Sequence, residues 1–263
     1  MSCKSDTLNT AVIVASHDGS QDLWAPLLTL FKQFWPDCPF PIYLVCNNAE
    51  YRSPGVTTIA VGPDRSWSDT LLAALRSIPE EYVLLWIDDH FVSRPVKAEE
   101  ILAAVKAFQK VSGNYLRLQS LPKPNARFNS YFGIVQKGAI YRTSTVASLW
   151  KKSVLAQLLK PGESAWDFEI LGTVRSNNYD GFYSVWHDCF QIENLLIKGR
   201  IWPASQRRIE RSLGRPLNLG RPAMSRAEEA VFFLRIICNR ILVSMPRRLA
   251  RVIHNAIRPG KTQ

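Results

Sequence analysis

The chain has 263 residues, 46% of them hydrophobic and 21% charged, with a formal net charge of +11. This composition is ordinary for a folded soluble protein with one large core, and no internal repeat or low-complexity tract is present. The five cysteines lack C-x-x-C spacing, which favours free thiols in a reducing compartment over a disulfide framework or a zinc site. We find no secretion signal and no apolar run of membrane-spanning length.

The positive charge is concentrated in the last quarter of the chain. Residues 1–197 carry 18 basic and 19 acidic side chains, whereas residues 198–263 carry 15 basic and 3 acidic ones. A near-neutral body is therefore followed by a segment of net charge +12, the difference between 15 and 3. Such segments bind anionic partners, for example a membrane surface, a nucleic acid or an acidic substrate.

Apolar strands alternate with amphipathic helices in the first third of the chain. The pattern predicts strands over 11–16, 42–46, 56–61 and 82–87, and helices over about 22–34 and from Ser66 or Ser68 to about 78. Polar residues follow each strand. This alternation predicts an α/β fold with a mostly parallel central sheet and helices on both faces.

The sequence after residue 90 predicts shorter strands, followed by a basic, mainly helical C-terminal extension. Helices are expected over 97–111, 145–159 and 164–176, strands over 115–119, 182–186 and 194–202, and a hairpin from strands 131–135 and 139–141. From residue 207 we expect an irregular linker, then a helix over 226–245 and a basic amphipathic helix over 247–257. We place a domain boundary between residues 1–205 and the basic helical extension 206–263.

The strand over 82–87 ends in two adjacent aspartates, Asp88 and Asp89. Its continuous apolar run is typical of a strand covered on both faces, and ligands bind beyond the carboxyl ends of such strands. Neighbouring carboxylates repel one another unless a cation compensates their charge. Oxygen ligands suit Mg²⁺ or Mn²⁺, which proteins often share with a substrate phosphate. The alternative is a solvated turn after a buried strand.

The order of these features resembles the GT-A class of nucleotide-sugar glycosyltransferases, particularly bacterial enzymes that build capsule or lipopolysaccharide. The resemblance covers about residues 10–205 and rests on the order of a strand that ends near Asp18, an apolar strand that ends in Asp88 and Asp89, a hairpin and the W-D-F-E segment at 166–169. It implies that Asp88 and Asp89 hold Mn²⁺ or Mg²⁺ and the nucleotide diphosphate, with Asp89 on the metal. The pair is followed by His90, a departure from the commonest D-x-D form, which leaves open which aspartate meets the metal and which meets the ribose.

The resemblance also implies a general base in the W-D-F-E segment, as in inverting enzymes of this class. A carboxylate in a partly dry pocket can take the proton of an acceptor hydroxyl, and Trp166 could stack on a sugar. Asp167 and Glu169 are two residues apart, so on a helix they point in different directions and one of them is the base. We favour Glu169 over Asp167. The alternative is a helix start whose acids interact favourably with the helix dipole.

Three more positions are candidates: the resemblance implies Asp18 and His187, and Arg65 lies at a predicted strand-to-helix junction. Asp18 is a candidate contact to the nucleotide base or ribose, and its alternative is a turn aspartate. Arg65 is a candidate phosphate contact, and its alternative is a surface arginine. His187, at the end of a predicted strand, is a candidate late metal ligand, and its alternative is a structural histidine.

The sequence therefore predicts a metal-dependent, inverting glycosyltransferase that moves a sugar from a nucleotide-sugar donor to a polysaccharide or lipid-linked acceptor. The basic amphipathic extension predicts peripheral attachment to an anionic membrane surface, the cytoplasmic face of the cell membrane. We expect no nucleic-acid partner, because no recognisable binding module is present. Two alternatives stay open: a metal-dependent phosphoester or diphosphate hydrolase, and a non-catalytic membrane-associated scaffold.

Overall fold

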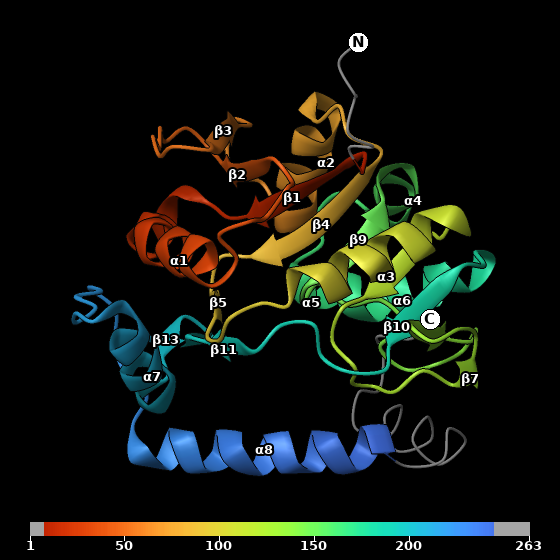
Figure 1. The fold of residues 1–263 in the computed structure, drawn as a ribbon. Helices are drawn as coiled ribbons and strands as arrows, with labels where there is room; N and C mark the ends of the chain where they lie inside the picture. Colours follow the sequence, from red (N-terminus) through yellow and green to blue (C-terminus); the bar gives the residue numbers. More distant parts are fainter. Residues whose placement is uncertain (1–7, 245–263) are drawn as a thin grey trace.

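A nine-stranded sheet organises residues 8–244, the part of the chain that the computed structural model describes (Figure 1). The strand order is β3-β2-β1-β4-β9-β6-β10-β8-β7, and all strands except β8 and β9 run in the same direction. The prediction of a mostly parallel α/β sheet is therefore confirmed. The strands are β1 Thr10–Ala15, β2 Ile42–Cys46, β3 Val56–Ala60, β4 Tyr82–Ile87, β6 Tyr115–Arg117, β7 Ala126–Arg127, β8 Phe132–Ile134, β9 Ser148–Lys151 and β10 Phe182–Val185.

β4 lies at the centre of the sheet, between β1 and β9. Its side chains alternate between two separate cores: Leu84 and Trp86 enter one, and Val83 and Leu85 enter the other. All four side chains are buried. The uninterrupted apolar run of this strand is therefore explained by cover on both faces.

Helices supply that cover (Figure 1). One face packs against α1 Gln21–Phe34, α3 Ala98–Lys110 and α7 Pro203–Leu213. The other face packs against α2 Trp67–Ser77, α4 Lys152–Leu158 and the helical segment that contains Phe168. Aromatic side chains dominate the first core, where the rings of Phe31 and Trp86 lie 5.4 Å apart, edge to face.

The predicted helix over 145–159 is wrong in its first half. Residues 148–151 form β9, which fills the space between β4 and β6 and runs antiparallel to both. Leu149 is buried in one core and Trp150 in the other, as a central strand requires. Only α4 is helical, so tertiary pairing overrides the local helical pattern here.

The predicted hairpin is also wrong in its second strand. β8 pairs with β7 on one side and β10 on the other, and residues 139–141 lie outside the sheet. This part of the chain turns away to bury Arg142, whose guanidinium lies 4.0 Å from the centre of the Phe182 ring and donates to Val135 O at 3.0 Å. The contacts of the buried Arg142 side chain with the Phe182 ring and with backbone carbonyls explain why residues 139–141 leave the sheet.

The predicted strand over 194–202 is three shorter ones. β11 Ile192–Asn194 pairs with β5 His90–Val92, and β12 Leu196–Ile197 forms a tight hairpin with β13 Arg200–Ile201. The turn uses left-handed residues Lys198 and Gly199, with φ of 51° and 75°. The single-strand prediction is therefore wrong at this turn.

The C-terminal extension begins with a helix that the sequence did not predict. α7 packs on α1, with Ile209 buried in the core, and ends at Gly214 in the left-handed region. After an irregular linker, α8 Arg226–Ser244 forms where a helix over 226–245 was expected. The predicted helix over 247–257 lies outside the described residues, and the domain boundary at 205/206 stays a prediction. Within residues 8–244, no helix is both long enough and apolar enough to traverse a bilayer.

Candidate active site

The carboxylate of Asp88 is held in place at the carboxyl end of β4. Its Oδ2 accepts a hydrogen bond of 2.7 Å from Ser16 Oγ, which follows the neighbouring strand β1. Ser16 Oγ in turn accepts a 2.6 Å hydrogen bond from Trp24 Nε1 of α1. Asp88 is buried. The hydrogen bonds through Ser16 and Trp24 fix its orientation from the end of β1 and from α1.

Asp89 and His90 complete the turn between β4 and β5. The Asp89 side chain is 21% exposed, and its Oδ1 lies 3.7 Å from His90 Nε2. The backbone of the turn is anchored by a bond from Leu195 N to Asp89 O at 2.9 Å and one from Trp86 Nε1 to His90 O at 2.6 Å. His90 is buried, and its Nδ1 has no hydrogen-bond partner in the described structure.

Two neighbouring carboxylates dominate the electrostatics of this turn, and the charge of Arg221 offsets only part of the cost of burying Asp89. Burial raises the pKa of Asp88, and the charge of Asp89 raises it further. Burial raises the pKa of Asp89 to about 7 and lowers the pKa of His90 to about 4, which favours the neutral imidazole. A bound cation would remove the strain of placing two carboxylates side by side.

The donors of this turn fit a divalent metal shared with a ligand. Among residues 8–244, no group of three or more His, Cys, Asp and Glu side chains is arranged to hold a metal alone. Mg²⁺ is usually bound through one or two carboxylates, with phosphate and water oxygens completing its shell. Asp88 and Asp89 match that requirement, with a nucleotide diphosphate as the source of the other ligands.

Arg221 reaches this site from the C-terminal linker. Its Nε and Nη2 donate to Asp22 Oδ2 and Oδ1 at 2.8 and 2.7 Å, and Nη2 also donates to Gly19 O at 2.7 Å. The bond to Asp22 raises the pKa of Arg221, and the charges of Asp22, Asp88 and Asp89 add to this effect. Arg221 is therefore a cation beside the acidic pair. Sequence reasoning noted it only as a linker residue, because its partner Asp22 is 199 positions away.

Asp18 ties the end of β1 to the end of β2. Its Oδ1 accepts from the backbone N–H groups of Asn47 and Ala49 at 2.9 and 3.2 Å, and its Oδ2 accepts from Asn48 N at 2.9 Å. Burial raises the pKa of Asp18, but the three backbone donors outweigh it and the pKa is lowered overall. The carboxylate organises this loop, and its predicted contact to a nucleotide stays a prediction.

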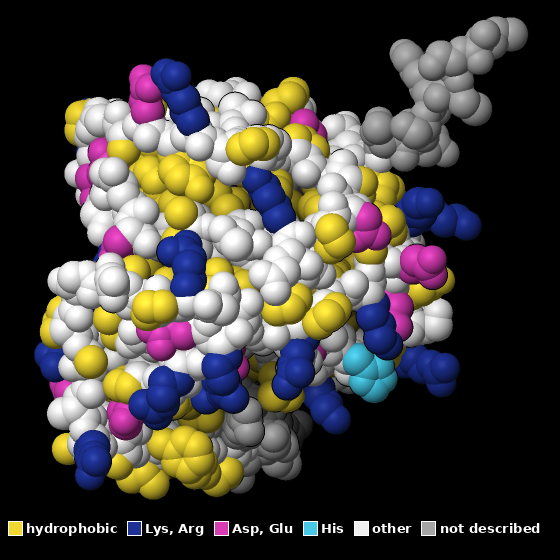
Figure 2. Space-filling model, turned by 60° about the vertical axis from the view of Figure 1, so that its left-hand side comes forward, with side chains coloured by type: hydrophobic (Ala, Val, Ile, Leu, Met, Phe, Trp, Pro, Cys, Tyr) yellow, Lys and Arg dark blue, Asp and Glu magenta, His cyan; other side chains and the backbone are white. Residues whose placement is uncertain are grey.

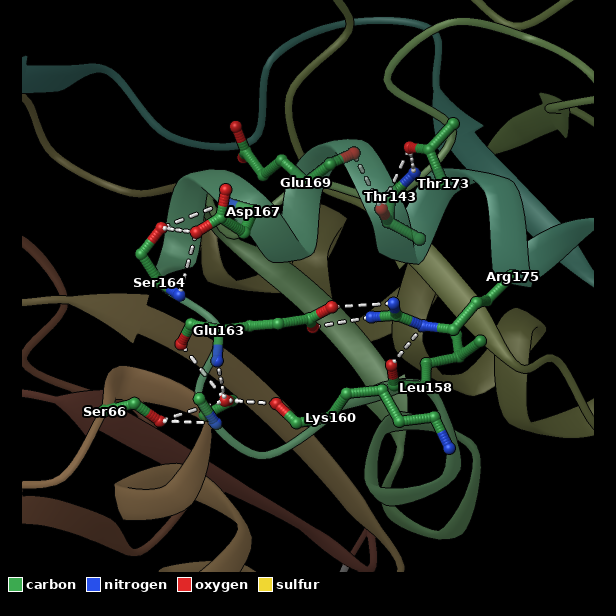
Figure 3. Close-up of polar contacts among 12 residues, drawn as sticks. Ser66, Thr143, Leu158, Lys160, Glu163, Ser164, Asp167, Glu169, Thr173 and Arg175 are labelled. Atoms are coloured by element: carbon green, nitrogen blue, oxygen red, sulfur yellow. Dashed lines mark hydrogen bonds and ion pairs between the residues drawn. The ribbon is translucent and has the colours of Figure 1, made fainter. Parts of the chain in front are cut away.

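The two acids of the W-D-F-E segment have different roles in the fold. Asp167 closes a capping box: its Oδ2 accepts from Ser164 N at 3.3 Å, and Ser164 Oγ accepts from Asp167 N at 3.1 Å. Asp167 Oδ2 also accepts from Ser164 Oγ at 2.7 Å. This arrangement is the helix start that was the alternative in the sequence. Trp166 is 67% exposed beside it. Figure 3 shows the Asp167 carboxylate turned back onto Ser164.

Glu169 lies in a single π-helical turn, residues Phe168–Gly172, between α5 Ala165–Asp167 and α6 Thr173–Arg175. Single π-helical turns of this kind are frequent at functional sites. Glu169 Oε1 accepts hydrogen bonds from Thr145 N at 2.8 Å, Thr145 Oγ1 at 3.0 Å and Ser144 Oγ at 3.1 Å. Because β9 is antiparallel to β4, residues 144 and 145 lie at the edge of the sheet where β4 ends.

The charge of Glu169 reaches the aspartate turn. Both Glu169 and Asp88 raise the pKa of His90, against the dominant effect of burial. Thr145, which holds Glu169, precedes β9 beside the carboxyl end of β4, so the fold brings Glu169 to the same edge of the sheet as Asp88 and Asp89, although these residues are about 80 positions apart in the sequence.

A partly buried ion pair lies below the π-helical turn (Figure 3). Arg175 Nη1 and Nη2 donate to Glu163 Oε1 and Oε2 at 2.7 and 2.6 Å, and Arg175 Nε donates to Leu158 O at 2.8 Å. Glu169 points away from this pair in the same view. The bidentate contact joins the two ends of the segment, residues 163 and 175.

Arg65 and His187 lie outside this cluster of contacts. Arg65 is exposed in the loop before α2, and His187 is exposed just after β10. β10 is separated from β4 by β9 and β6. The phosphate contact of Arg65 and the metal ligation of His187 stay predictions.

Comparison with known proteins identifies the fold. No protein-family profile and no curated protein sequence matches the chain. Among solved structures, S. aureus TarS residues 1–349 in complex with UDP matches 83% of this chain and 67% of its own, with a TM-score of 0.50 and 13% identity. A second S. aureus TarS structure gives a TM-score of 0.45 at 13% identity over 69% of this chain and 36% of its own. The mannose-1-phosphate geranyltransferase of Thermus thermophilus gives 0.47 at 13% identity over 76% and 79%.

The similarity to the UDP complex of TarS, at a TM-score of 0.50, concerns the fold. The chain has a GT-A-like fold, the α/β architecture of nucleotide-sugar transferases. It spans about a third of the length of the longer TarS structure, 36%. Identity as low as 13% carries the fold alone, so activity has to be argued from the site.

Proposed function

We propose that this protein is a glycosyltransferase that takes a sugar from a nucleotide-sugar donor. The observation that carries the proposal is the convergence of Asp88, Asp89 and Glu169 at the carboxyl end of β4 in a GT-A-like sheet. The TarS structure that shares this fold was solved in complex with UDP, which supports a nucleotide diphosphate as the class of ligand. Ligands of open α/β sheets bind at this edge as a rule.

The donor side of the site consists of the acidic turn and Arg221. Asp88 and Asp89 would hold Mn²⁺ or Mg²⁺, with Asp89, the more exposed of the two, as the direct ligand. Such a metal, when bound, neutralises the charge that develops on a leaving diphosphate. Arg221 adds a fixed cation beside the same turn, oriented by its bidentate contact to Asp22.

The acceptor side of the site consists of Glu169. Its three hydrogen bonds all go to Oε1, so Oε2 is the oxygen that would take the proton of the acceptor hydroxyl. The hydroxyl oxygen then attacks the anomeric carbon as the bond to the diphosphate breaks, which inverts that carbon. Asp167 is the less suitable base, because its carboxylate already closes the capping box with Ser164.

The acceptor that we propose is a growing glycan or a lipid-linked saccharide of a bacterial surface polysaccharide. This follows from the resemblance of the sequence to that group of enzymes. A basic extension would bring the protein to the cytoplasmic face of the cell membrane, where lipid-linked acceptors are found.

Thermal shift with a panel of nucleotide diphosphates and nucleotide sugars, with and without Mn²⁺, tests the donor side directly. A ligand that binds only the folded protein raises its melting temperature, and we expect the rise to depend on Mn²⁺ for one nucleotide. Product analysis of that nucleotide sugar, with and without a saccharide acceptor, tests the reaction. Hydrolysis at equal rates in both reactions would favour a hydrolase, and an absence of binding throughout the panel would favour a scaffold.

A further inference from the structure

α8 carries a continuous apolar stripe on the side that faces away from the rest of the protein. Eleven large hydrophobic side chains are exposed among the described residues, and five of them belong to this one helix. Their exposed fractions are 50% for Val231, 60% for Phe233, 61% for Leu234, 40% for Ile237 and 52% for Ile241. Such a concentration on one element is unusual for a surface that meets only water.

The helical spacing shows that the stripe is the outer face of α8. Leu234, Ile237 and Ile241 follow one another at steps of three and four residues, so they stack along one side. Phe232 and Ile236 are partly buried and lie about half a turn away. The ring of Phe232 packs edge to face against Trp202, 5.1 Å between centres. α8 thus has one row of contacts to the body and a second apolar row without cover among the described residues.

The two acidic side chains of α8, Glu228 and Glu229, lie in its first turn, on the N-terminal side of the stripe. Glu228 accepts from Ser225 N at 2.7 Å and pairs with Arg200 at 3.4 Å, so it is directed at the body, and Glu229 is partly buried. Arg226 and Arg235 are exposed beside the stripe. Figure 2 shows hydrophobic side chains gathered at the lower edge, the level of α8 in Figure 1, below a row of Lys and Arg side chains.

The charge of the surrounding segment selects an anionic partner. Residues 198–244 contain ten basic and three acidic side chains, a net of +7. An apolar stripe with basic borders matches the interfacial region of a bilayer, where acyl chains meet charged headgroups. α8 is not long and apolar enough to span the bilayer, so the match concerns a helix that lies along the membrane surface.

We propose that α8 docks in the plane of an anionic membrane surface through the stripe Val231, Phe233, Leu234, Ile237 and Ile241. The stripe enters the boundary between headgroups and acyl chains, while Arg226 and Arg235 contact lipid phosphates. Nineteen residues give the helix a length of about 28 Å along the surface. This docking surface goes beyond the proposed transfer reaction and does not depend on it, since it can be measured without any substrate.

Flotation of the full-length protein with phosphatidylglycerol–phosphatidylcholine vesicles tests the proposal. Leu234→Glu places a charge in the stripe, and Val111→Glu makes the same change in charge at a 38% exposed apolar position at the end of α3. Both variants lower the net charge equally, so a general electrostatic attraction would weaken equally in both. Circular dichroism and melting temperature confirm that each variant is folded.

We expect the wild-type protein and Val111→Glu to float with the anionic vesicles and Leu234→Glu to bind at least about tenfold more weakly. Pure phosphatidylcholine vesicles should bind the wild-type protein less than the anionic ones do. Equal flotation of the two variants, or a wild-type protein that ignores both kinds of vesicle, would overturn the proposal. A wild-type dimer in sedimentation that Leu234→Glu converts to monomer, without vesicle binding, would assign the stripe to a second copy of the chain.

Discussion

Glu169 Oε1 accepts the backbone N–H of Thr145 at 2.8 Å, and this bond joins the π-helical turn to the start of β9. It places a carboxylate at the edge where β4 ends, beside a buried His90 whose pKa responds to it. A base has to be held firmly and still keep an oxygen for the proton that it takes. The geometry of Glu169 meets both conditions.

Glu169→Gln should keep the fold and nucleotide binding and lose sugar transfer. The glutamine carbonyl can still accept from Thr145 N, so the melting temperature should change little, but the amide cannot take a proton. We expect kcat to fall by about 10²- to 10⁴-fold, the usual contribution of a general base. Steady-state kinetics with a nucleotide sugar and an acceptor measure this.

The matched control for that variant is Asp167→Asn. Asparagine retains the oxygen that accepts from Ser164, so the capping box is preserved and transfer should continue. Full activity of Glu169→Gln combined with an inactive Asp167→Asn would assign the base to Asp167 instead.

Asp89→Asn should abolish the dependence of nucleotide binding on Mn²⁺. The neutral amide relieves the repulsion in the acidic pair, so we expect unchanged or higher stability together with a loss of metal affinity. Calorimetry with the best nucleotide diphosphate, with Mn²⁺ and with EDTA, measures this directly. Asp37→Asn is the control, because Asp37 is an exposed acid after α1. Mn²⁺-dependent binding that survives in Asp89→Asn would remove Asp89 from the metal site.

Much of this site could be predicted from the sequence, because the residues that form its acidic turn lie close together along the chain. The apolar run of β4 and the aspartates after it are contiguous in sequence, so both the buried strand and the acidic edge could be predicted. The helical segment at 165–175 was predicted as well. Helix α8 was expected from its periodicity, over the part that the structure describes.

The remainder depends on pairing between distant segments. β9 is only four residues long, and a strand of that length is recognisable only beside β4 and β6. Without β9 there is no reason to place Thr145 beside Glu169. Arg221 was equally hidden, because a single arginine in a linker becomes informative only once Asp22 lies opposite it.

The acid titration of Asp18 gives a pH-dependent prediction. The pKa of Asp18 is lowered below its unfolded value of 3.8 by the backbone donors of residues 47–49, against the opposing effect of burial. The carboxylate therefore contributes stability that is fully present above pH 3.8 and is lost as the pH falls through the lower folded pKa. At neutral pH, Asp18→Asn should be less stable than the wild-type protein by about 1–2 kcal/mol.

Urea denaturation of the wild-type protein and Asp18→Asn, at neutral pH and near pH 3, tests the direction of this pH dependence. We expect the difference in unfolding free energy between the two proteins to shrink in acid, because protonation removes the negative charge of Asp18 in the wild-type protein, whereas asparagine carries no charge at either pH. A difference that grows in acid would contradict the arrangement around Asp18.

Arg221→Lys tests whether the C-terminal linker takes part in the donor site. Lysine keeps the charge but cannot make the two parallel bonds to Asp22 or the third bond to Gly19 O. We expect a loss of about 1 kcal/mol in stability and a several-fold weaker affinity for the nucleotide diphosphate, because the cation is no longer oriented toward the acidic turn. Arg211→Lys, at an exposed position on α7, is the control and should change neither quantity.

If Asp22→Asn lowers nucleotide affinity as much as Arg221→Lys, and the double variant is no worse than either single one, then orientation by Asp22 is how Arg221 acts. Additive losses would instead show that the two residues affect the site independently.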